Sequence, residues 1–287
     1  MMIVRTRRLQ TAILTVAVVL IVTGVAASRS DAMQIVRSID APGSSPFGLD
    51  YIEVSPGIGV IFHTDNQSGD VYRITTGGDP TLLFNVGDSI GLPYATYTAQ
   101  GICFVGDPDN WEFGVLYILE ADRGGAPYYT YVRAFSPDGT HLDTWDVSDI
   151  VDRAKGITHD GDHFWLIGNA SIVKCDASFN LVQSYPIPWG GGNGGFDFDP
   201  ITHRLYNADV LNQYVITFAR GSSTSEYEWY SGVYNVPALA IGHLYRGTRY
   251  LWLMDNSQVQ GRIVEVMDQF YDPVESTSWG AIKALFR

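Results

Sequence analysis

The sequence predicts an all-β fold, a five-bladed β-propeller, from three features. A short core of glycine or alanine followed by apolar residues recurs at Gly48, Gly101, Gly156, Gly195 and Ala238. Each core is followed by further short apolar runs separated by turn residues, which is the pattern of an antiparallel meander. Finally, the 30 glycines and 13% aromatic residues suit a ring of small sheets joined by many turns.

The unit is clearest in residues 154–188. Its first strand begins at Gly156, and an Asp-Gly turn at 159–162 leads into the second strand, because Asp-Gly supplies the positive φ that a tight hairpin needs. The second strand, 163–167 (HFWLI), is continuously apolar and so is expected to be buried on both faces. A third strand at 172–175 and a fourth at 181–187 complete a four-stranded sheet.

The other units follow the same order along the chain. Second strands are predicted at 60–66, 115–122, 163–169, 204–209 and 250–256. Third strands are predicted at 71–75, 129–136, 171–175, 213–218 and 262–266, and fourth strands at 81–86, 141–147, 181–187 and 225–231. The fifth unit has no fourth strand of its own, but residues 33–40 could supply it and close the ring without exposed edges. Six blades are the alternative, if 269–278 adds strands.

Both ends of the chain differ from the repeats. Residues 1–27 have the form of a secretory signal peptide, with three arginines in the first ten residues, an apolar run at 11–26 and small residues before Ser28. We therefore expect a secreted, periplasmic or cell-surface protein, with an uncleaved anchor as the alternative. Residues 28–268 form the propeller. Residues 269–287 are a linker and a short amphipathic helix that either docks on the propeller or is recognised by a partner, its apolar residues being Trp279, Ile282, Leu285 and Phe286.

The charge excludes two classes of partner. The formal net charge is −13, and the three arginines of the signal segment are its only charged side chains, so the chain from Ser28 carries −16. An acidic surface repels nucleic acid and anionic membrane, and we expect neither as a partner beyond the signal or anchor segment itself. We expect a monomer that binds a small molecule, a glycan, a peptide or a protein.

The two cysteines do not form a disulfide framework. Cys103 falls on a first strand and Cys175 on a third strand of the next blade, too far apart for a bridge. We expect two buried thiols.

Polar residues at the ends of the second strands suggest a metal site. One oxygen-bearing group for each blade, on one rim, would suit a hard cation such as calcium. The alternative is that aspartate and asparagine are there because tight turns prefer them. The candidate ligands are Asp65, Glu120, Asp122, Asn169, Asp209 and Asp255.

Loops that enter the first strands suggest a second candidate site, at the channel mouth. Aromatic rings with nearby amides can stack on and orient a saccharide or peptide. The alternative is that these rings wedge between blades. The candidate ligand-binding residues are Tyr94, Tyr97, Gln100, Lys155, Trp189, Asn193 and Asn235.

The turn HDGDH at 159–163 is a third candidate. His159 and His163 could share a metal with Asp160 or Asp162, although the turn by itself explains the aspartate and the glycine.

The repeats resemble the secreted five- and six-bladed propeller superfamily of NHL-repeat, YncE-like and SMP-30-like proteins, over residues 33–268. The resemblance is carried by the first-strand cores and by DPITHRLY at 199–206. SMP-30 lactonases have a metal-binding glutamate where this chain has Phe47. Propeller-type glutaminyl cyclases are similar at 99–101 and 154–161, but they have a glutamate where Lys155 stands, and this charge inversion argues against cyclase activity. The last residues resemble endings of some secreted bacterial proteins.

These observations predict an exported propeller that binds a ligand or partner at its channel mouth. One alternative is a metal-dependent hydrolase or lyase acting on a carbohydrate or lactone. The other is a structural cell-surface scaffold. No G-x-S-x-G elbow supports a serine hydrolase.

Overall fold

The computed structural model describes residues 33–91, 97–122, 129–187, 193–222, 224–257 and 261–268. Met1–Ala32 is a separate unit from the rest of the chain. The predicted signal segment and the predicted C-terminal helix therefore lie outside the described residues. None of the helices in the described ranges is long and apolar enough to span a membrane.

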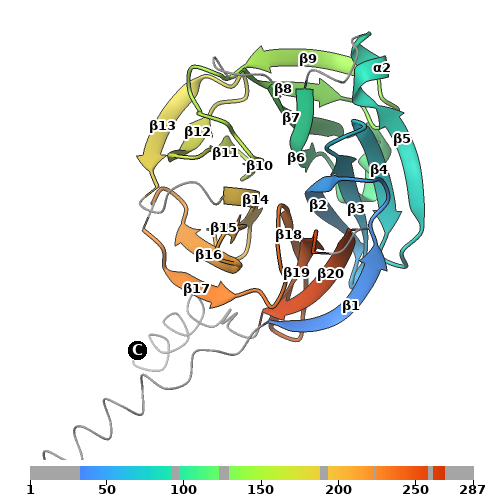
Figure 1. Cartoon of the computed structure of the whole chain (residues 1–287), viewed down its shortest axis with the longest axis vertical. Coiled ribbons are helices and arrows are strands. Elements are labelled where there is room, and N and C mark those ends of the chain that lie inside the picture. Colours follow the sequence, from blue (N-terminus) through green and yellow to red (C-terminus); the bar gives the residue numbers. More distant parts are fainter. Residues whose placement is uncertain are drawn as a thin grey trace, which may run out of the picture. The chain divides into compact units, whose positions relative to one another are not determined.

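Five four-stranded antiparallel sheets form the blades of a propeller, as predicted (Figure 1). The first two blades contain β2 (Pro46–Ser55), β3 (Ile58–Asp65), β4 (Asp70–Thr75) and β5 (Pro80–Asn85), then β6 (Tyr97–Val105), β7 (Val115–Asp122), β8 (Thr130–Phe135) and β9 (His141–Asp146). The third and fourth contain β10 (Gly156–His159), β11 (Phe164–Ile167), β12 (Ser171–Cys175) and β13 (Leu181–Pro186), then β14 (Asn193–Asp199), β15 (Arg204–Asp209), β16 (Tyr214–Ala219) and β17 (Tyr227–Tyr230). The fifth contains β18 (Leu239–Tyr245), β19 (Thr248–Asp255), β20 (Arg262–Asp268) and β1 (Gln34–Asp40).

The fifth blade closes the ring with strands from both ends of the described chain. β1 pairs antiparallel with β20, with Ile39 opposite Ile263 and Gln34 opposite Met267. This confirms that residues 33–40 supply the missing fourth strand. The pairing covers the outer edge of β20, which would otherwise present unpaired backbone groups.

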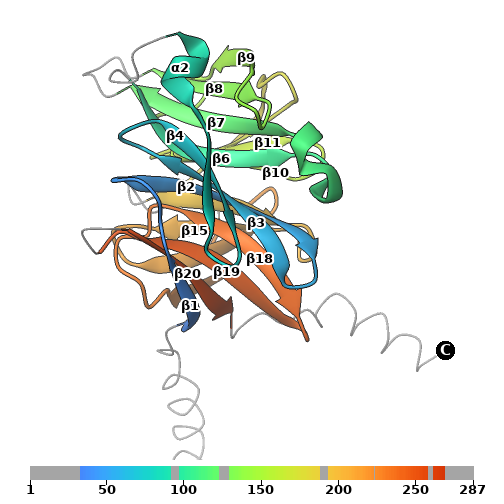
Figure 2. The ribbon, with the colours of Figure 1, turned by 90° about the vertical axis from the view of Figure 1, so that its right-hand side faces the viewer.

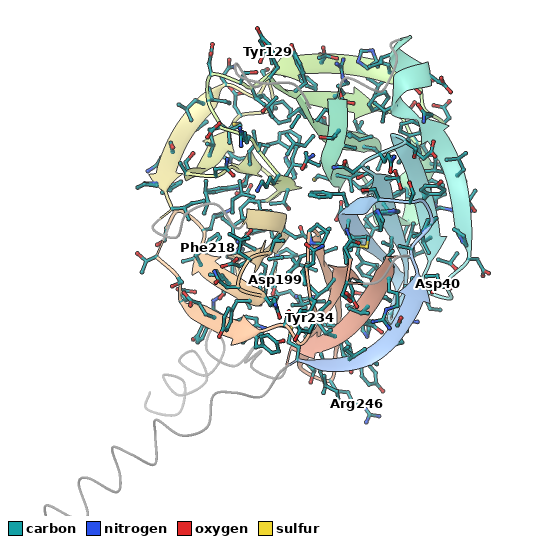
Figure 3. All side chains as sticks on the ribbon, viewed as in Figure 1. Asp40, Tyr129, Asp199, Phe218, Tyr234 and Arg246 are labelled. Carbon is teal, nitrogen blue, oxygen red and sulfur yellow. The ribbon has the colours of Figure 1, made fainter. Side chains whose placement is uncertain are left out.

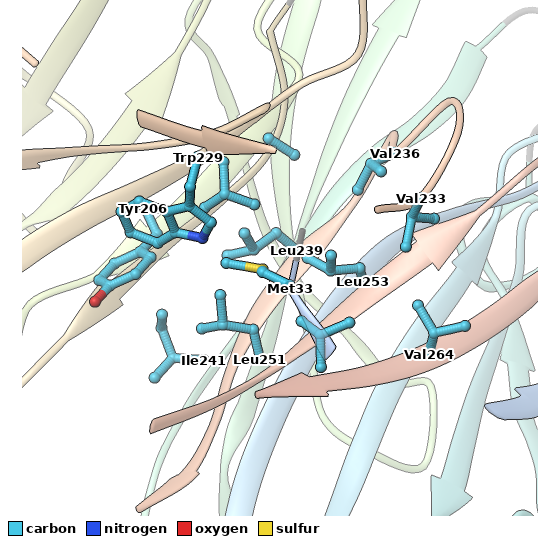
Figure 4. Close-up of a cluster of buried hydrophobic side chains, with 13 residues drawn as sticks. Met33, Tyr206, Trp229, Val233, Val236, Leu239, Ile241, Leu251, Leu253 and Val264 are labelled. Atoms are coloured by element: carbon cyan, nitrogen blue, oxygen red, sulfur yellow. The ribbon is translucent and has the colours of Figure 1, made fainter. Parts of the chain in front are cut away.

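Each blade buries both of its faces. Five apolar clusters fill the five gaps between neighbouring blades, and Figure 4 shows the one between the fourth and fifth blades, where Trp229 meets Leu239 and Leu251. Alternate residues of a second strand enter opposite clusters: Phe164 packs toward the second blade and Trp165 toward the fourth. The second strands are continuously apolar for this reason.

The inner strands approach one another closely around the channel, and glycine permits this approach. A Cβ on Gly195 would lie 1.9 Å from the backbone nitrogen of Leu239 in the next blade. A Cβ on Gly101 would lie 3.3 Å from the Cα of Gly156. The recurring glycine of the first-strand core is therefore a packing requirement of the ring.

The two ends of the channel are built from different connections. We call the end formed by the first-to-second-strand connections the hairpin end; these connections are 56–57, 106–114, 160–163, 200–203 and 246–247. The one at 106–114 contains the 3₁₀ helix η2 (Pro108–Phe113). In Figure 2 the tip of the β18–β19 hairpin points to the right, and the short helix α2 (Val86–Ile90), which follows β5, lies at the top.

Candidate functional site

The third position of the first-strand core places polar side chains in the channel. This position is occupied by Asp50, Cys103, Thr158, Asp197 and Ala240 in the five blades. The first four line one cavity at the hairpin end of the channel. The residues come from β2, β6, β10 and β14, so the ring brings together groups that are up to 147 positions apart in the sequence.

The two aspartates satisfy backbone amides of the inner strands. Each inner strand is the edge of its blade, so some of its N–H groups point into the channel without a strand partner. The Asp50 carboxylate accepts from the Tyr51 amide at 2.7 Å and from the Phe104 amide of the next blade at 2.5 Å. It thus joins two neighbouring inner strands.

Asp197 repeats this arrangement across the ring. Its Oδ1 accepts from the Phe198 amide at 2.7 Å, and its Oδ2 accepts from the Ile241 amide of the next blade at 2.6 Å. The Thr158 hydroxyl also donates to Oδ1, at 2.7 Å. The two carboxyl groups therefore have equivalent places in the first and fourth blades.

Burial is the main cause that raises the pKa of both carboxyls. Burial raises the pKa of Asp50 well above its usual range, and the charge of Asp197 raises it further, although the two amide hydrogen bonds lower it. Burial raises the pKa of Asp197 to about 6, again against the hydrogen bonds that it accepts. Both carboxyls are therefore weaker acids than an exposed aspartate. Burial and the two carboxylates also raise the pKa of the Cys103 thiol.

A cavity of about 400 Å³ lies over this pair. Ile52, Phe104, Phe198 and Ile241 form apolar walls, and the exposed residues Glu53, Gly161 and Ile201 line its opening to solvent. The volume falls within the range of cavities that hold small organic ligands. Apolar walls around a few convergent polar groups are the usual composition of such a site.

The cation that lines this cavity is already paired. The Arg249 guanidinium donates to Asp199 Oδ1 at 2.5 Å and to the Gly242 carbonyl at 3.0 Å. Asp199, labelled in Figure 3, also accepts from the Ile201 amide in the β14–β15 connection. Asp199, the first residue of the DPITHRLY motif, therefore accepts hydrogen bonds both from its own turn and from Arg249. Because Arg249 is paired with Asp199, it does not neutralise Asp50 and Asp197.

Three of the predicted calcium ligands accept hydrogen bonds from their own turns. Asp65 accepts from the amides of Ser45, Gln67 and Ser68 at 2.7 to 2.9 Å. Asp209 accepts from two turn amides and from the Asn212 side chain, and Asp255 accepts from the Ser257 amide and from Arg262. Turn formation accounts for these three positions.

Two of the remaining predicted metal ligands, Glu120 and Asn169, also have hydrogen-bond partners of their own. Glu120 is buried against Arg133, whose Nε lies 2.5 Å from its carboxylate. The backbone amide of Asn169 donates to the Asp152 carbonyl. The side chain of Asp122 is outside the described residues. Among the described histidines, cysteines and acids, no group of three close ligand atoms includes Asp65, Glu120, Asp209 or Asp255. The calcium ring stays a prediction.

The predicted channel-mouth residues are only partly described. Tyr94 and Trp189 lie outside the described residues, as do the side chains of Tyr97 and Asn193. The three others are placed, but at separate points: Gln100 donates to the Thr98 hydroxyl, Asn235 is exposed with a φ of 49°, and burial and Arg153 lower the pKa of the half-buried Lys155. Ligand binding at this mouth stays a prediction.

The HDGDH turn does bring ligand-type atoms together. Asp160, Asp162 and His163 each place one within 4.8 Å of the others. Asp160, however, already accepts from two turn amides, from the Trp165 indole at 2.7 Å and from Arg220 at 3.3 Å. The turn and the neighbouring arginine account for Asp160 without a metal ion.

Both cysteines are buried free thiols, as expected. Both belong to the apolar cluster between the second and third blades, but Cys103 also lines the channel cavity with the two aspartates. The two thiols therefore face different chemical surroundings.

Comparison with known proteins supports the fold alone. No family model matches the chain, and no curated protein matches it. The solved glutaminyl cyclase of Myxococcus xanthus is similar with a TM-score of 0.57 at 13% identity, over 84% of this chain and 98% of that one. A virginiamycin B lyase from Staphylococcus aureus (14% identity, 79% and 67% covered, TM-score 0.43) and a streptogramin B lyase (14%, 80% and 86%, TM-score 0.44) are more distant. The chain is a five-bladed β-propeller with an acidic cavity in its channel.

Asp50 and Asp197 are not among the site residues predicted from the sequence. The predicted residues lie in loops and at the ends of the second strands, where aspartate is common in any turn. A usable signal was present in the first-strand cores, since two of the five have an aspartate at a position where a buried inner strand favours an apolar residue.

Proposed function

We propose that this chain is an exported propeller that binds a small organic cation in the cavity at the hairpin end of its channel. The proposed ligand has an amine or amidine group attached to an apolar framework. The observation that carries this proposal is the pair Asp50 and Asp197, which lies beneath apolar walls in a cavity of about 400 Å³. The arginine-rich start and apolar run of residues 1–27 support export.

The charge of the cavity favours a cation. Asp197, whose pKa is about 6, is ionised above that pH, and the acidic residue Glu53 lies at the opening, while Arg249 is paired with Asp199. A cationic nitrogen placed over the two aspartates would interact favourably with the ionised Asp197 carboxylate. Binding should therefore strengthen as the pH rises through about 6, the pKa of Asp197.

The geometry favours an organic cation over a bare metal ion. Within the described ranges, Asp50, Asp197 and Cys103 do not form a group of ligand atoms within 4.8 Å of one another. Their oxygens also accept four backbone amides, which leaves few lone pairs for a coordination sphere. The hydrolase or lyase alternative and the scaffold alternative stay sequence-based predictions.

The test is calorimetric titration of the 28–287 chain with benzylamine and benzamidine, with benzyl alcohol as the neutral isostere. We expect binding of the two cations at pH 7.5, at least tenfold weaker binding at pH 5, and none of the alcohol. Asp197→Asn should weaken binding, whereas Asp176→Asn, in the exposed β12–β13 turn, should not. Equal binding of the alcohol and the amine, or an unchanged affinity in Asp197→Asn, would contradict the proposal.

A further inference from the structure

The last strand in the described residues, β20, ends near the edge of the cavity at the hairpin end. β20 ends at Asp268, whose strand partner is Arg249, and Arg249 lines the cavity. Third strands run in the same direction as first strands in a meander, so β20 ends at the hairpin end. Nineteen residues of the sequence, 269–287, follow from this point.

The rim of the same end exposes large apolar side chains. Four of the five first-to-second-strand hairpins have one in the connection or in the strand residue next to it: Ile58 is 63% exposed and Phe113 87%, and Ile201 and Tyr245 are about half exposed. The fifth connection, at 160–163, instead has the exposed acid Asp162. The surface therefore combines an apolar rim with acidic groups, and it surrounds the cavity.

Residues 278–287, SWGAIKALFR, have the complementary chemistry. They contain two cations, Lys283 and Arg287, and no acid, in a chain whose net charge is −13. Their large apolar residues are Trp279, Ile282, Leu285 and Phe286. At about 3.3 Å for an extended residue, the nine residues 269–277 that precede this segment span up to about 30 Å.

We propose that residues 278–287 are the built-in occupant of this surface, with Lys283 placed over the Asp50 and Asp197 pair and the apolar residues on the rim. This inference rests on the proposed function, because it names the cation that fills the site in the absence of another. A free ligand must then displace the segment. Tethering gives the segment a millimolar effective concentration, so a weak contact suffices to hold it.

The chain offers a direct test because it contains only three lysines, Lys155, Lys174 and Lys283. Zero-length carbodiimide coupling of the 28–287 chain, followed by mass spectrometry, should join Lys283 to Asp50, Glu53 or Asp197, the acids of the pair and of the cavity opening, within one molecule. Lys283→Gln should abolish this product, and Lys174→Gln should not. A product of twice the chain mass, or no coupling of Lys283 to these three acids, would overturn the proposal.

A second readout separates this inference from the proposed function. In Lys283→Glu and in Trp279→Ala, the affinity for benzylamine should rise on the order of tenfold, because the tethered competitor is weakened. If both variants bind benzylamine as the unmodified chain does, the segment is not the occupant, but the cation site stands. If no variant binds benzylamine, and Lys283 couples to none of the three acids, the proposed function and this inference fail together.

Discussion

Two sets of aspartates in this propeller have the same side chain and opposite surroundings. Asp65 and Asp209 follow second strands, and each accepts turn amides close to it in sequence. Asp50 and Asp197 lie on inner strands, and each also accepts an amide from the neighbouring blade. The first set is explained by local structure, whereas the second set depends on the ring.

The electrostatic consequence differs between the sets. Burial tends to raise the pKa of Asp65, but its amide hydrogen bonds outweigh burial and lower it. For Asp50 and Asp197, burial outweighs similar hydrogen bonds and raises the pKa, and the charge of Asp197 raises that of Asp50 further. An aspartate in a turn therefore stays ionised over a wide pH range, while a buried inner-strand aspartate such as Asp197 can exchange a proton near pH 6.

The largest effect should come from removing a turn aspartate. Asp65→Ala leaves the amides of Ser45, Gln67 and Ser68 without their acceptor, and we expect a loss of about 3 kcal/mol in the free energy of unfolding. Denaturant titration measures it. Asp138→Ala, in the exposed turn between β8 and β9, is the matched control and should cost under about 1 kcal/mol. Equal losses in the two variants would remove the structural distinction.

The next effect is a pH dependence of opposite sign for the two sets. Because the folded pKa of Asp197 is raised to about 6, its stabilisation is present at low pH and is lost as the pH rises through about 6. From pH 4 to pH 7, the stability of the unmodified chain relative to Asp197→Asn should fall by about 1 to 2 kcal/mol.

Asp65→Asn provides the contrast. Because the folded pKa of Asp65 is lowered, its stabilisation is present above the unfolded pKa, near 3.8, and is lost as the pH falls below it. Unfolding midpoints measured every half pH unit for both variants check the two signs. The same sign for both would mean that Asp197 is an ordinary turn-type anion.

The smallest effect concerns the hydroxyl that supports the pair. Thr158→Val removes the 2.7 Å hydrogen bond to Asp197, and we expect a loss of about 1 kcal/mol in stability. This bond favours the ionised carboxylate, so the pKa of Asp197 should rise further above about 6. Carbon-13 NMR titration of the aspartate carboxyls measures it, and a pKa that stays unchanged or falls would show that the hydroxyl does not support the ionised form.

The sequence by itself determined the repeat architecture. The glycine or alanine of each first-strand core, the turn residues and the continuously apolar second strands are local consequences of burial on two faces and of tight turns, so they can be read from short stretches. The closing strand at 33–40 was also predictable, because a unit without a fourth strand and a strand without a unit complement each other. The turn aspartates are also local features, because each one accepts hydrogen bonds from amides close to it in the sequence.

The tertiary structure alone decided which polar residues share an environment. Asp50 and Asp197 lie 147 positions apart in the sequence, and each shares its strand with a second acid, Glu53 in β2 and Asp199 in β14. They line one cavity because closure of the ring directs the third position of the inner strands toward the channel, where burial raises the pKa of both and the charge of Asp197 raises that of Asp50 further. Electrostatic coupling depends on distance through space and on loss of solvent, and neither quantity is encoded in the spacing of residues along the chain.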